Sequence, residues 1–113
     1  MRLTFVIKFV ADMDNAVAFY RDTLGLTLKF QSPFWSEFVT GETTLALHPA
    51  SDKNPAGGCE LGFTTPDIDG FYQVKSAAGV VFTRPPFDEH GNRLANFLDS
   101  EGAQVSLSGR PTS

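Results

Sequence analysis

Residues 11–26 read ADMDNAVAFYRDTLGL, and this stretch decides the fold because it occurs a second time. Asp12-Met13-Asp14 returns 55 residues later as Asp67-Ile68-Asp69, and Gly25 returns 54 residues later as Gly79. A deletion of one residue reconciles the two copies. Internal similarity at a fixed offset indicates that the chain contains two copies of one structural unit.

Caps and apolar spacing predict a helix in each copy, over about residues 14–24 and 68–78. The Asp residues that open each copy can accept hydrogen bonds from the exposed N–H groups of the first turn. A Gly closes each copy and supplies the left-handed residue that commonly ends a helix. The expected buried faces are Met13, Val17, Tyr20 and Leu24 in the first helix, and Ile68, Phe71, Val74 and Ala78 in the second.

Apolar extended segments surround both helices, so that each half reads strand, helix, three strands. We expect one domain over residues 1–113, with a first module of about 1–50, a linker of about 49–58 rich in Pro, Gly, Ser and Asn, and a second module of about 59–110. Residues 85–92, with His90, are predicted to be a solvated loop. The predicted strands are residues 3–10, 26–31, 35–40, 43–48, 61–65, 80–83, 93–98 and 103–108.

Composition excludes several classes of function. The net charge is −4 and the nine basic residues are scattered singly, so nucleic acid is not an expected partner. No apolar run reaches the ~20 residues that span a bilayer, so no membrane association is expected. Cys59 is the only cysteine, which excludes an internal disulfide, and we expect an inert core or interface thiol in a cytoplasmic protein.

Three motifs carry a family resemblance. Residues 18–26, AFYRDTLGL, resemble the helix-end signature of the vicinal oxygen chelate superfamily, the glyoxalase, bleomycin-resistance and extradiol dioxygenase group. Residues 65–69, TPDID, and 96–102, NFLDSEG, are also similar to that family, with Ser100 where Pro is usual. The resemblance covers nearly the whole chain. It implies an α+β fold in which two βαβββ modules form a curved mixed sheet around an open cup, usually completed in a homodimer.

The resemblance also implies four metal-ligand positions, which the enzymes of the group fill with His or Glu. In this sequence these positions fall at Phe5, Ala46, Glu60 and Ser106. Only Glu60 is a good ligand, whereas catalytic sites of this kind usually need at least three protein ligands. We therefore expect no tightly bound metal and no cofactor.

The predicted ligand-binding residues are Phe5, Trp35, His48, Glu60 and Ser106. His48 shares a strand face with Ala46, so it is expected towards the cup, as a polar pocket residue or as a displaced ligand paired with Glu60. Alternation places Trp35, Glu37 and Val39 on one face of their strand, and Phe34, Ser36 and Phe38 on the other. The sequence leaves open which of these faces lines the cup.

Two classes of function follow. The first is a metal-free protein that binds a planar or cationic small molecule, as the bleomycin-resistance branch does in antibiotic resistance. The second is a lyase or isomerase related to the glyoxalases and dioxygenases, with a displaced metal or with Glu60 and His48 as acid and base. A dimeric scaffold with an empty cup is a third, weaker reading. The missing metal ligands favour binding.

Overall fold

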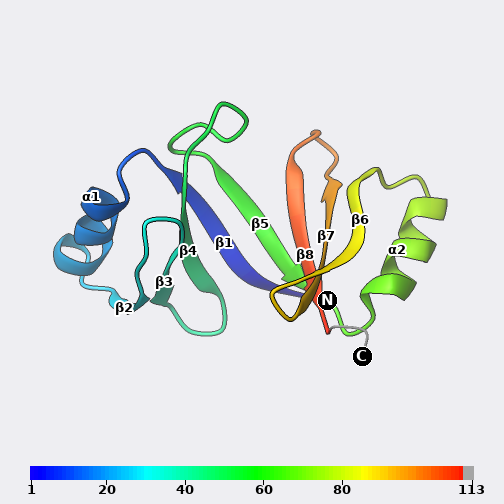
Figure 1. Cartoon of the computed structure of the whole chain (residues 1–113), viewed down its shortest axis with the longest axis horizontal. Helices are drawn as coiled ribbons and strands as arrows, with labels where there is room; N and C mark the ends of the chain where they lie inside the picture. Colours follow the sequence, from blue (N-terminus) through cyan, green and yellow to red (C-terminus); the bar gives the residue numbers. More distant parts are fainter. Residues whose placement is uncertain (111–113) are drawn as a thin grey trace. The chain divides into compact units, whose positions relative to one another are not determined.

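The structure, a computed structural model, describes residues 1–110, so the last three residues of the expected domain lie outside it. Two compact units divide the chain, one over Thr4–Cys59 and the other beginning at Glu60 and including Met1–Leu3. We refer to them as the first and second modules; in Figure 1 they run from blue to green and from green to red. Each has the order strand, helix, three strands, which confirms the predicted fold of two βαβββ modules.

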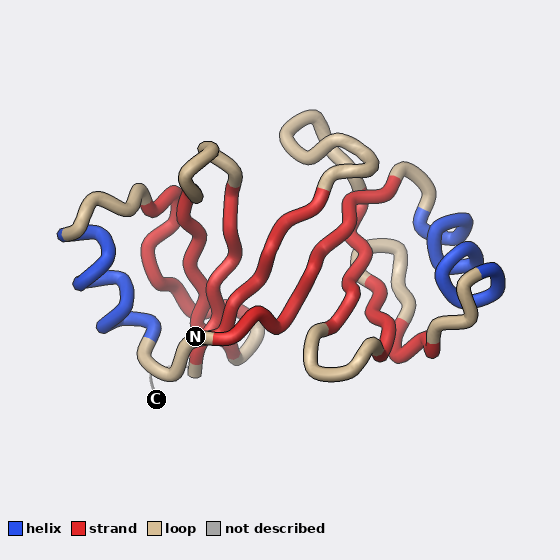
Figure 2. The backbone as a smooth tube through the Cα atoms, turned by 180° about the vertical axis from the view of Figure 1, so that it is seen from behind, coloured by secondary structure: helices blue, strands red, loops and turns tan. Residues whose placement is uncertain are grey.

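The first module is a mixed four-stranded arrangement in the order β2-β3-β4-β1. β1 and β4 pair in parallel, while β3 pairs antiparallel with β4 and with β2. The helix covers one face of these strands, as Figure 2 shows. The elements are β1 (Arg2–Val10), α1 (Met13–Ala18), the π-helical segment η1 (Phe19–Thr23), β2 (Thr27–Phe30), β3 (Ser36–Val39) and β4 (Thr44–Pro49).

The second module repeats this plan in the strand order β5-β8-β7-β6. β5 and β8 pair in parallel, and β7 pairs antiparallel with β8 and with β6. Its core joins Ile68 of the helix to Ala95 and Leu107 of the strands. The elements are β5 (Cys59–Thr64), α2 (Ile68–Ala77), β6 (Phe82–Glu89), β7 (Asn92–Leu98) and β8 (Gln104–Gly109).

The first helix differs from the prediction in its second half, where it becomes a π-helix. The N–H of Leu24 donates to the carbonyl of Phe19, five residues earlier, at 3.0 Å. The wider π turn rotates later side chains away from the face that Met13 and Val17 define. Leu24, expected to be buried, is therefore 55% exposed, and Leu26 packs against the core instead.

The buried side of α2 is shorter than predicted. Ile68 is 2% exposed and Phe71 packs beside it, but Val74 is 63% exposed and Ala78 is also exposed. The helix packs against the strands through its first turn, where Phe71 lies 6.0 Å from Phe97 between ring centroids. The expected burial of Val74 and Ala78 is therefore wrong.

The predicted loop at residues 85–92 is a β-hairpin. β6 runs through Pro85 and Pro86 to Glu89, and it pairs only with β7 among the described residues. Prolines are tolerated there because an edge strand does not need every N–H group, and the pairing shifts register between Arg84 and Phe87. The turn residues His90 and Gly91 have φ values of 50° and 78°, the positive values that a two-residue hairpin turn of type I′ requires.

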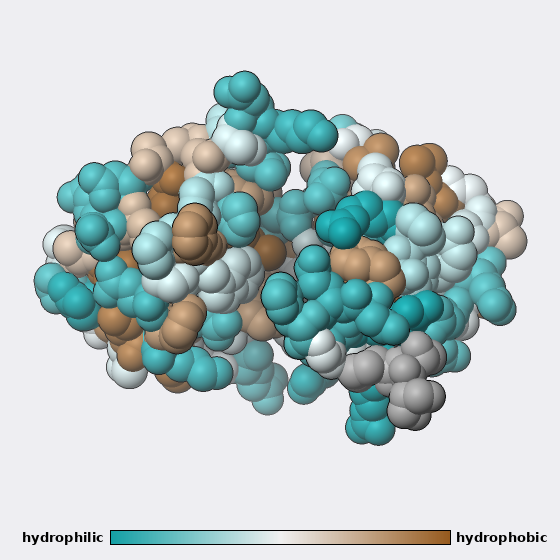
Figure 3. Space-filling view, viewed as in Figure 1, coloured by the Kyte–Doolittle hydropathy of each residue, from teal (hydrophilic) through white to brown (hydrophobic). Residues whose placement is uncertain are grey.

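The linker between β4 and β5 contains no helix or strand. Figure 3 shows it as a hydrophilic projection. Its end is nevertheless fixed to β1, because the N–H of Phe9 donates to the carbonyl of Gly58 and the N–H of Gly57 donates to the carbonyl of Phe9, each at 2.9 Å.

No helix among the described residues has the length and apolarity needed to cross a membrane.

An ion-pair cluster ties α2 to the hairpin of the second module. Arg93 donates to both carboxylate oxygens of Asp69, at 2.8 to 3.1 Å, and to Asp88 at 3.1 Å. The hydrogen bonds from Arg93 hold the pKa of Asp69 below its ordinary value of 3.8. Because the folded state lowers this pKa, the pair stabilises the fold above that value, and the contribution is lost as pH falls through the folded pKa.

We therefore expect Asp69→Asn to lower the melting temperature at about pH 7 and to lower it less at about pH 2, because the contribution of the ionised carboxyl shrinks as pH falls through the folded pKa. Thermal unfolding followed by circular dichroism at both pH values measures the difference. Asp52→Asn, which removes an exposed linker carboxylate, is the matched control. An equal effect of Asp69→Asn at both pH values would contradict the expectation.

Candidate functional site

The packing of β3 decides which of its faces is covered by the helix. Ser36 and Phe38 are both 0% exposed, and Phe38 packs with Val17 of α1 and Leu47 of β4. The alternate residues of the strand therefore point to the opposite face of the module. Trp35 packs there against the cluster of Ile7, Phe9 and Ala46, which answers the question that alternation left open.

Aromatic rings gather on this face, which the helix leaves uncovered but where Ile7, Phe9 and Ala46 are buried. The ring of Trp35 lies 6.2 Å from that of Phe5 and 6.2 Å from that of His48, and Phe9 lies 5.8 Å from His48, all between centroids and edge to face. We call these four residues, with Glu37, the aromatic face. Three of the five predicted ligand-binding residues are thus brought together by β1, β4 and the residue before β3 in one module.

Glu37 adds a carboxylate to the aromatic face. The indole Nε1 of Trp35 donates to Glu37 Oε2 at 2.7 Å, which fixes both side chains. Its other oxygen, Oε1, lies 3.9 Å from the ammonium of Lys29, a side chain that is 65% exposed and so screens the carboxylate weakly. Alternation predicted Glu37 as a pocket residue only if the face that it shares with Trp35 lines the cup.

The other two predicted residues meet in the second module. Ser106 Oγ donates to Glu60 Oε2, and Asn96 Nδ2 donates to Ser106 Oγ at 3.3 Å. Glu60 is 8% exposed and Asn96 is 9% exposed. The register of β7 and β8 places Asn96 directly opposite Ser106, so three adjacent strands hold one chain of polar groups. Nothing in the sequence alone had singled out Asn96.

We expect Ser106→Ala to lower the free energy of unfolding by about 1–3 kcal/mol, because the buried Glu60 carboxylate loses its hydroxyl donor. Urea denaturation near neutral pH measures the loss. Ser108→Ala, two residues along the strand, removes a hydroxyl whose partners within residues 1–110 are the neutral groups Thr64 Oγ1 and Phe63 O, so it is expected to cost less. Equal costs would show that the carboxylate does not depend on Ser106.

The donor set at the four inherited ligand positions does not fit a divalent metal. Phe5 and Ala46 have no donor atom, and the hydroxyl of Ser106 is already engaged by Glu60. His48 is exposed and its Nδ1 lies 2.8 Å from the carbonyl oxygen of the next residue. Within residues 1–110, no three His, Cys, Asp or Glu side chains lie close enough together to hold a metal ion.

Elemental analysis of protein purified without added metal is therefore expected to give far less than one equivalent of Ni, Zn, Fe or Mn. A lone carboxylate completed by waters binds these ions too weakly to survive purification. Dialysis against a chelator should leave the melting temperature unchanged. About one equivalent of bound metal, or a large fall in melting temperature after chelation, would contradict this prediction.

Cys59 and His90 are the remaining residues that the sequence raised as candidates for a thiol or metal role. Cys59 is exposed at the start of β5, so the core alternative for this thiol is wrong and the interface alternative stays a prediction. His90 is exposed in the turn between β6 and β7. Neither residue contributes to a metal-binding cluster among the described side chains.

Comparison with known proteins gives one family match. The model of the Glyoxalase/Bleomycin resistance protein/Dioxygenase superfamily matches residues 2–107. No curated protein matches the chain.

Solved structures share the fold at low identity. The hypothetical protein BH1468 from Bacillus halodurans C-125 is 17% identical, with 99% of this chain and 96% of that chain covered and a TM-score of 0.81. Methylmalonyl-CoA epimerase from Mycobacterium tuberculosis is 18% identical over 97% and 88% of the two chains, with a TM-score of 0.78. A glyoxalase/bleomycin resistance protein/dioxygenase superfamily member from Vibrio splendidus 12B01 is 16% identical over 96% and 97%, with a TM-score of 0.76. These similarities establish the fold alone.

Proposed function

The chain belongs to the glyoxalase/bleomycin resistance protein/dioxygenase superfamily, and from that membership we propose that it binds a planar cationic small molecule on the aromatic face without a metal. The observation that carries the proposal is the pairing of Trp35 with Glu37 on the uncovered face. Drug sequestration, as in the bleomycin-resistance branch, is the role that we propose for such binding.

The chemistry of the aromatic face supports a flat, positively charged ligand. The rings of Phe5 and Trp35 offer apolar surface, and a cation over an aromatic ring gains about 0.5–2 kcal/mol. The Glu37 carboxylate sits at the edge of the indole ring and supplies an opposite charge. The net charge of −4 favours the approach of cations in addition. At one position where the enzymes of the family place a metal ligand, the partly exposed Phe5 adds apolar surface instead.

Trp35 reports on this site directly, because it is the only tryptophan of the chain. We expect 10-methylacridinium to quench its fluorescence saturably in the presence of a chelator. Acridine, which has nearly the same shape and is neutral at mildly alkaline pH, should bind at least about tenfold more weakly. Equal affinity for the two probes, or no saturable quenching by either, would overturn the proposal.

A metal-free enzyme is the second candidate, and the buried chain of Glu60, Ser106 and Asn96 is the observation that favours it. A carboxylate removed from water and held by a hydroxyl is placed as a general base requires. Glu60→Gln discriminates between the candidates. Loss of turnover with retained binding supports the enzyme, whereas unchanged binding of 10-methylacridinium with no turnover of any tested substrate supports the binding protein.

The homodimer and the cytoplasmic location implied earlier remain predictions. Exposed apolar side chains, Phe34 at 76% and Val81 at 59%, are available to a second copy of the chain. Light scattering that shows a stable monomer would contradict the homodimer.

A further inference from the structure

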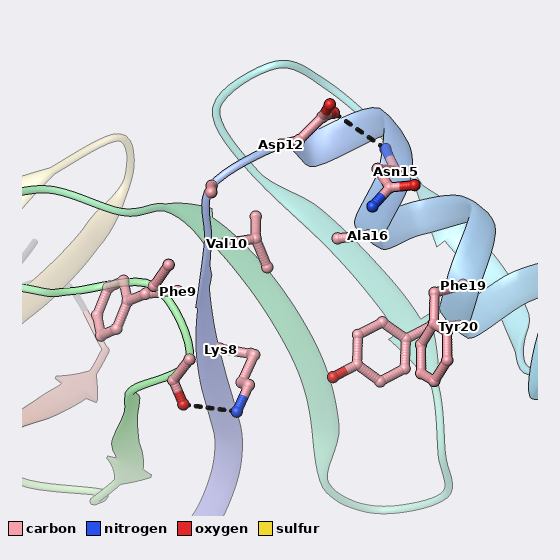
Figure 4. Close-up of a pocket in the computed structure, with 11 residues that line it drawn as sticks. Lys8, Phe9, Val10, Asp12, Asn15, Ala16, Phe19 and Tyr20 are labelled. Atoms are coloured by element: carbon pink, nitrogen blue, oxygen red, sulfur yellow. Dashed lines mark hydrogen bonds between the residues drawn. The ribbon is translucent and has the colours of Figure 1, made fainter.

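A pocket of about 350 Å³ lies on the other side of β1, within the first module. It is bounded by α1, the start of η1, β1 and the end of the linker (Figure 4). Alternation along β1 sends Lys8 and Val10 towards the helix, whereas Phe5 belongs to the aromatic face. The pocket therefore lies on the opposite side of β1 from Phe5, and of the aromatic face only Phe9 is among its lining residues. Its volume lies at the lower end of the range for small-molecule sites.

Lys8 brings a positive charge to this pocket with little to balance it. The side chain is half-buried, and its ammonium donates to the carbonyl of Gly57 at 2.6 Å, the dashed line in Figure 4. Among the described residues it forms no ion pair. A partly buried ammonium with one neutral acceptor has further N–H groups to offer, and an anionic ligand would satisfy them.

Tyr20 and Phe19 form the opposite wall. The ring of Tyr20 is fixed against Phe38, 5.8 Å between centroids, and its hydroxyl points across the pocket towards β1 in Figure 4. No hydrogen bond is formed by that hydroxyl within residues 1–110. Phe19 packs edge to face on Tyr20 at 5.3 Å and is 48% exposed, which leaves ring surface for a ligand. Both residues begin η1, and single π turns occur frequently at functional sites.

The Asp12 carboxylate lies at the end of the pocket away from Lys8 and disfavours a ligand with a second negative charge there. Its carboxylate accepts from the N–H of Asn15 at 3.1 Å, and Figure 4 shows it at the start of the helix, away from Lys8. A second anionic group reaching that end would be repelled. The geometry points to a site for a small monocarboxylate with an aromatic or compact apolar body. Its carboxylate lies at Lys8 and the Tyr20 hydroxyl, and its body lies against Phe19.

Benzoate and benzamide, which differ in charge but hardly in shape, test this site by amide NMR of the full chain. Benzoate is expected to shift the resonances of residues 15–20 saturably, and to bind at least about tenfold more tightly than benzamide. Lys8→Met is expected to remove that preference. Lys75→Met, which removes an exposed lysine from α2, should leave it intact.

Tyr20→Phe provides a second, more conservative variant and is expected to weaken benzoate binding several-fold with no change in the folded spectrum. The indole N–H resonance of Trp35 separates this pocket from the aromatic face, and benzoate should leave it in place. Equal affinity for benzoate and benzamide, retained preference in Lys8→Met, or a benzoate shift confined to Trp35 would each overturn the site.

Discussion

Glu37→Gln is expected to weaken the binding of 10-methylacridinium about tenfold or more, while acridine binding and the melting temperature stay as in the unmodified protein. Glutamine keeps the shape of the side chain and an oxygen that accepts from Trp35 Nε1. Only the negative charge is lost. In a half-buried position an opposite charge contributes on the order of 1–2 kcal/mol, because partial solvation screens it.

Fluorescence titration of Trp35 with both probes measures this effect. Glu42→Gln removes an exposed carboxylate from the turn between β3 and β4 and is the matched control. Trp35→Phe, followed by calorimetry, should weaken both probes because ring surface is lost. If Glu37→Gln and Glu42→Gln weaken the cation equally, the attraction comes from net charge and not from the aromatic face.

Phe38→Ala is expected to cost about 3–5 kcal/mol of unfolding free energy, the range for emptying a fully buried phenylalanine site. Phe38 is 0% exposed, and Val17 and Leu47 surround it beneath α1. The loss is a large part of the stability of a small domain, so Phe38→Leu is a milder companion variant. Urea denaturation measures both.

Val39→Ala is the control for Phe38, since Val39 is the next residue of β3 and is 51% exposed. It should change the unfolding free energy by less than about 1 kcal/mol. The contrast between neighbouring residues tests the face assignment itself. If Phe38→Ala costs no more than Val39→Ala, the strand is turned the other way, and Trp35 and Glu37 do not share an uncovered face.

Most of the fold could be predicted from the internal repeat in the sequence. Seven of the eight strands and both helical regions lie close to their predicted ranges, because caps and alternation are local signals. The π turn was missed since the spacing of Met13, Val17 and Tyr20 fits an α-helix equally well. The hairpin strand through Pro85 was missed because proline weakens a strand signal, and only its edge position makes it acceptable.

The sequence predicted several residues of the candidate site, but it did not predict which of them contact one another. The sequence named Trp35 and His48, but period two treats both faces of a strand alike. Only the packing of α1 on Phe38 shows which face of β3 the helix covers. Glu60 and Ser106 were each placed by the family resemblance, whereas their hydrogen bond depends on strand register, which no local pattern encodes. Lys8 and Tyr20 were not among the predicted binding residues, although tertiary packing brings them to one pocket.

NMR tests metal-free binding at Trp35 through one resonance, because the single tryptophan gives a single indole N–H signal. The measurement is the shift of this signal when 10-methylacridinium is added to chelator-treated protein. We expect a saturable shift, with the same affinity before and after chelation. An indole signal that does not move, or that moves only after a divalent metal is restored, would contradict metal-free binding on the aromatic face.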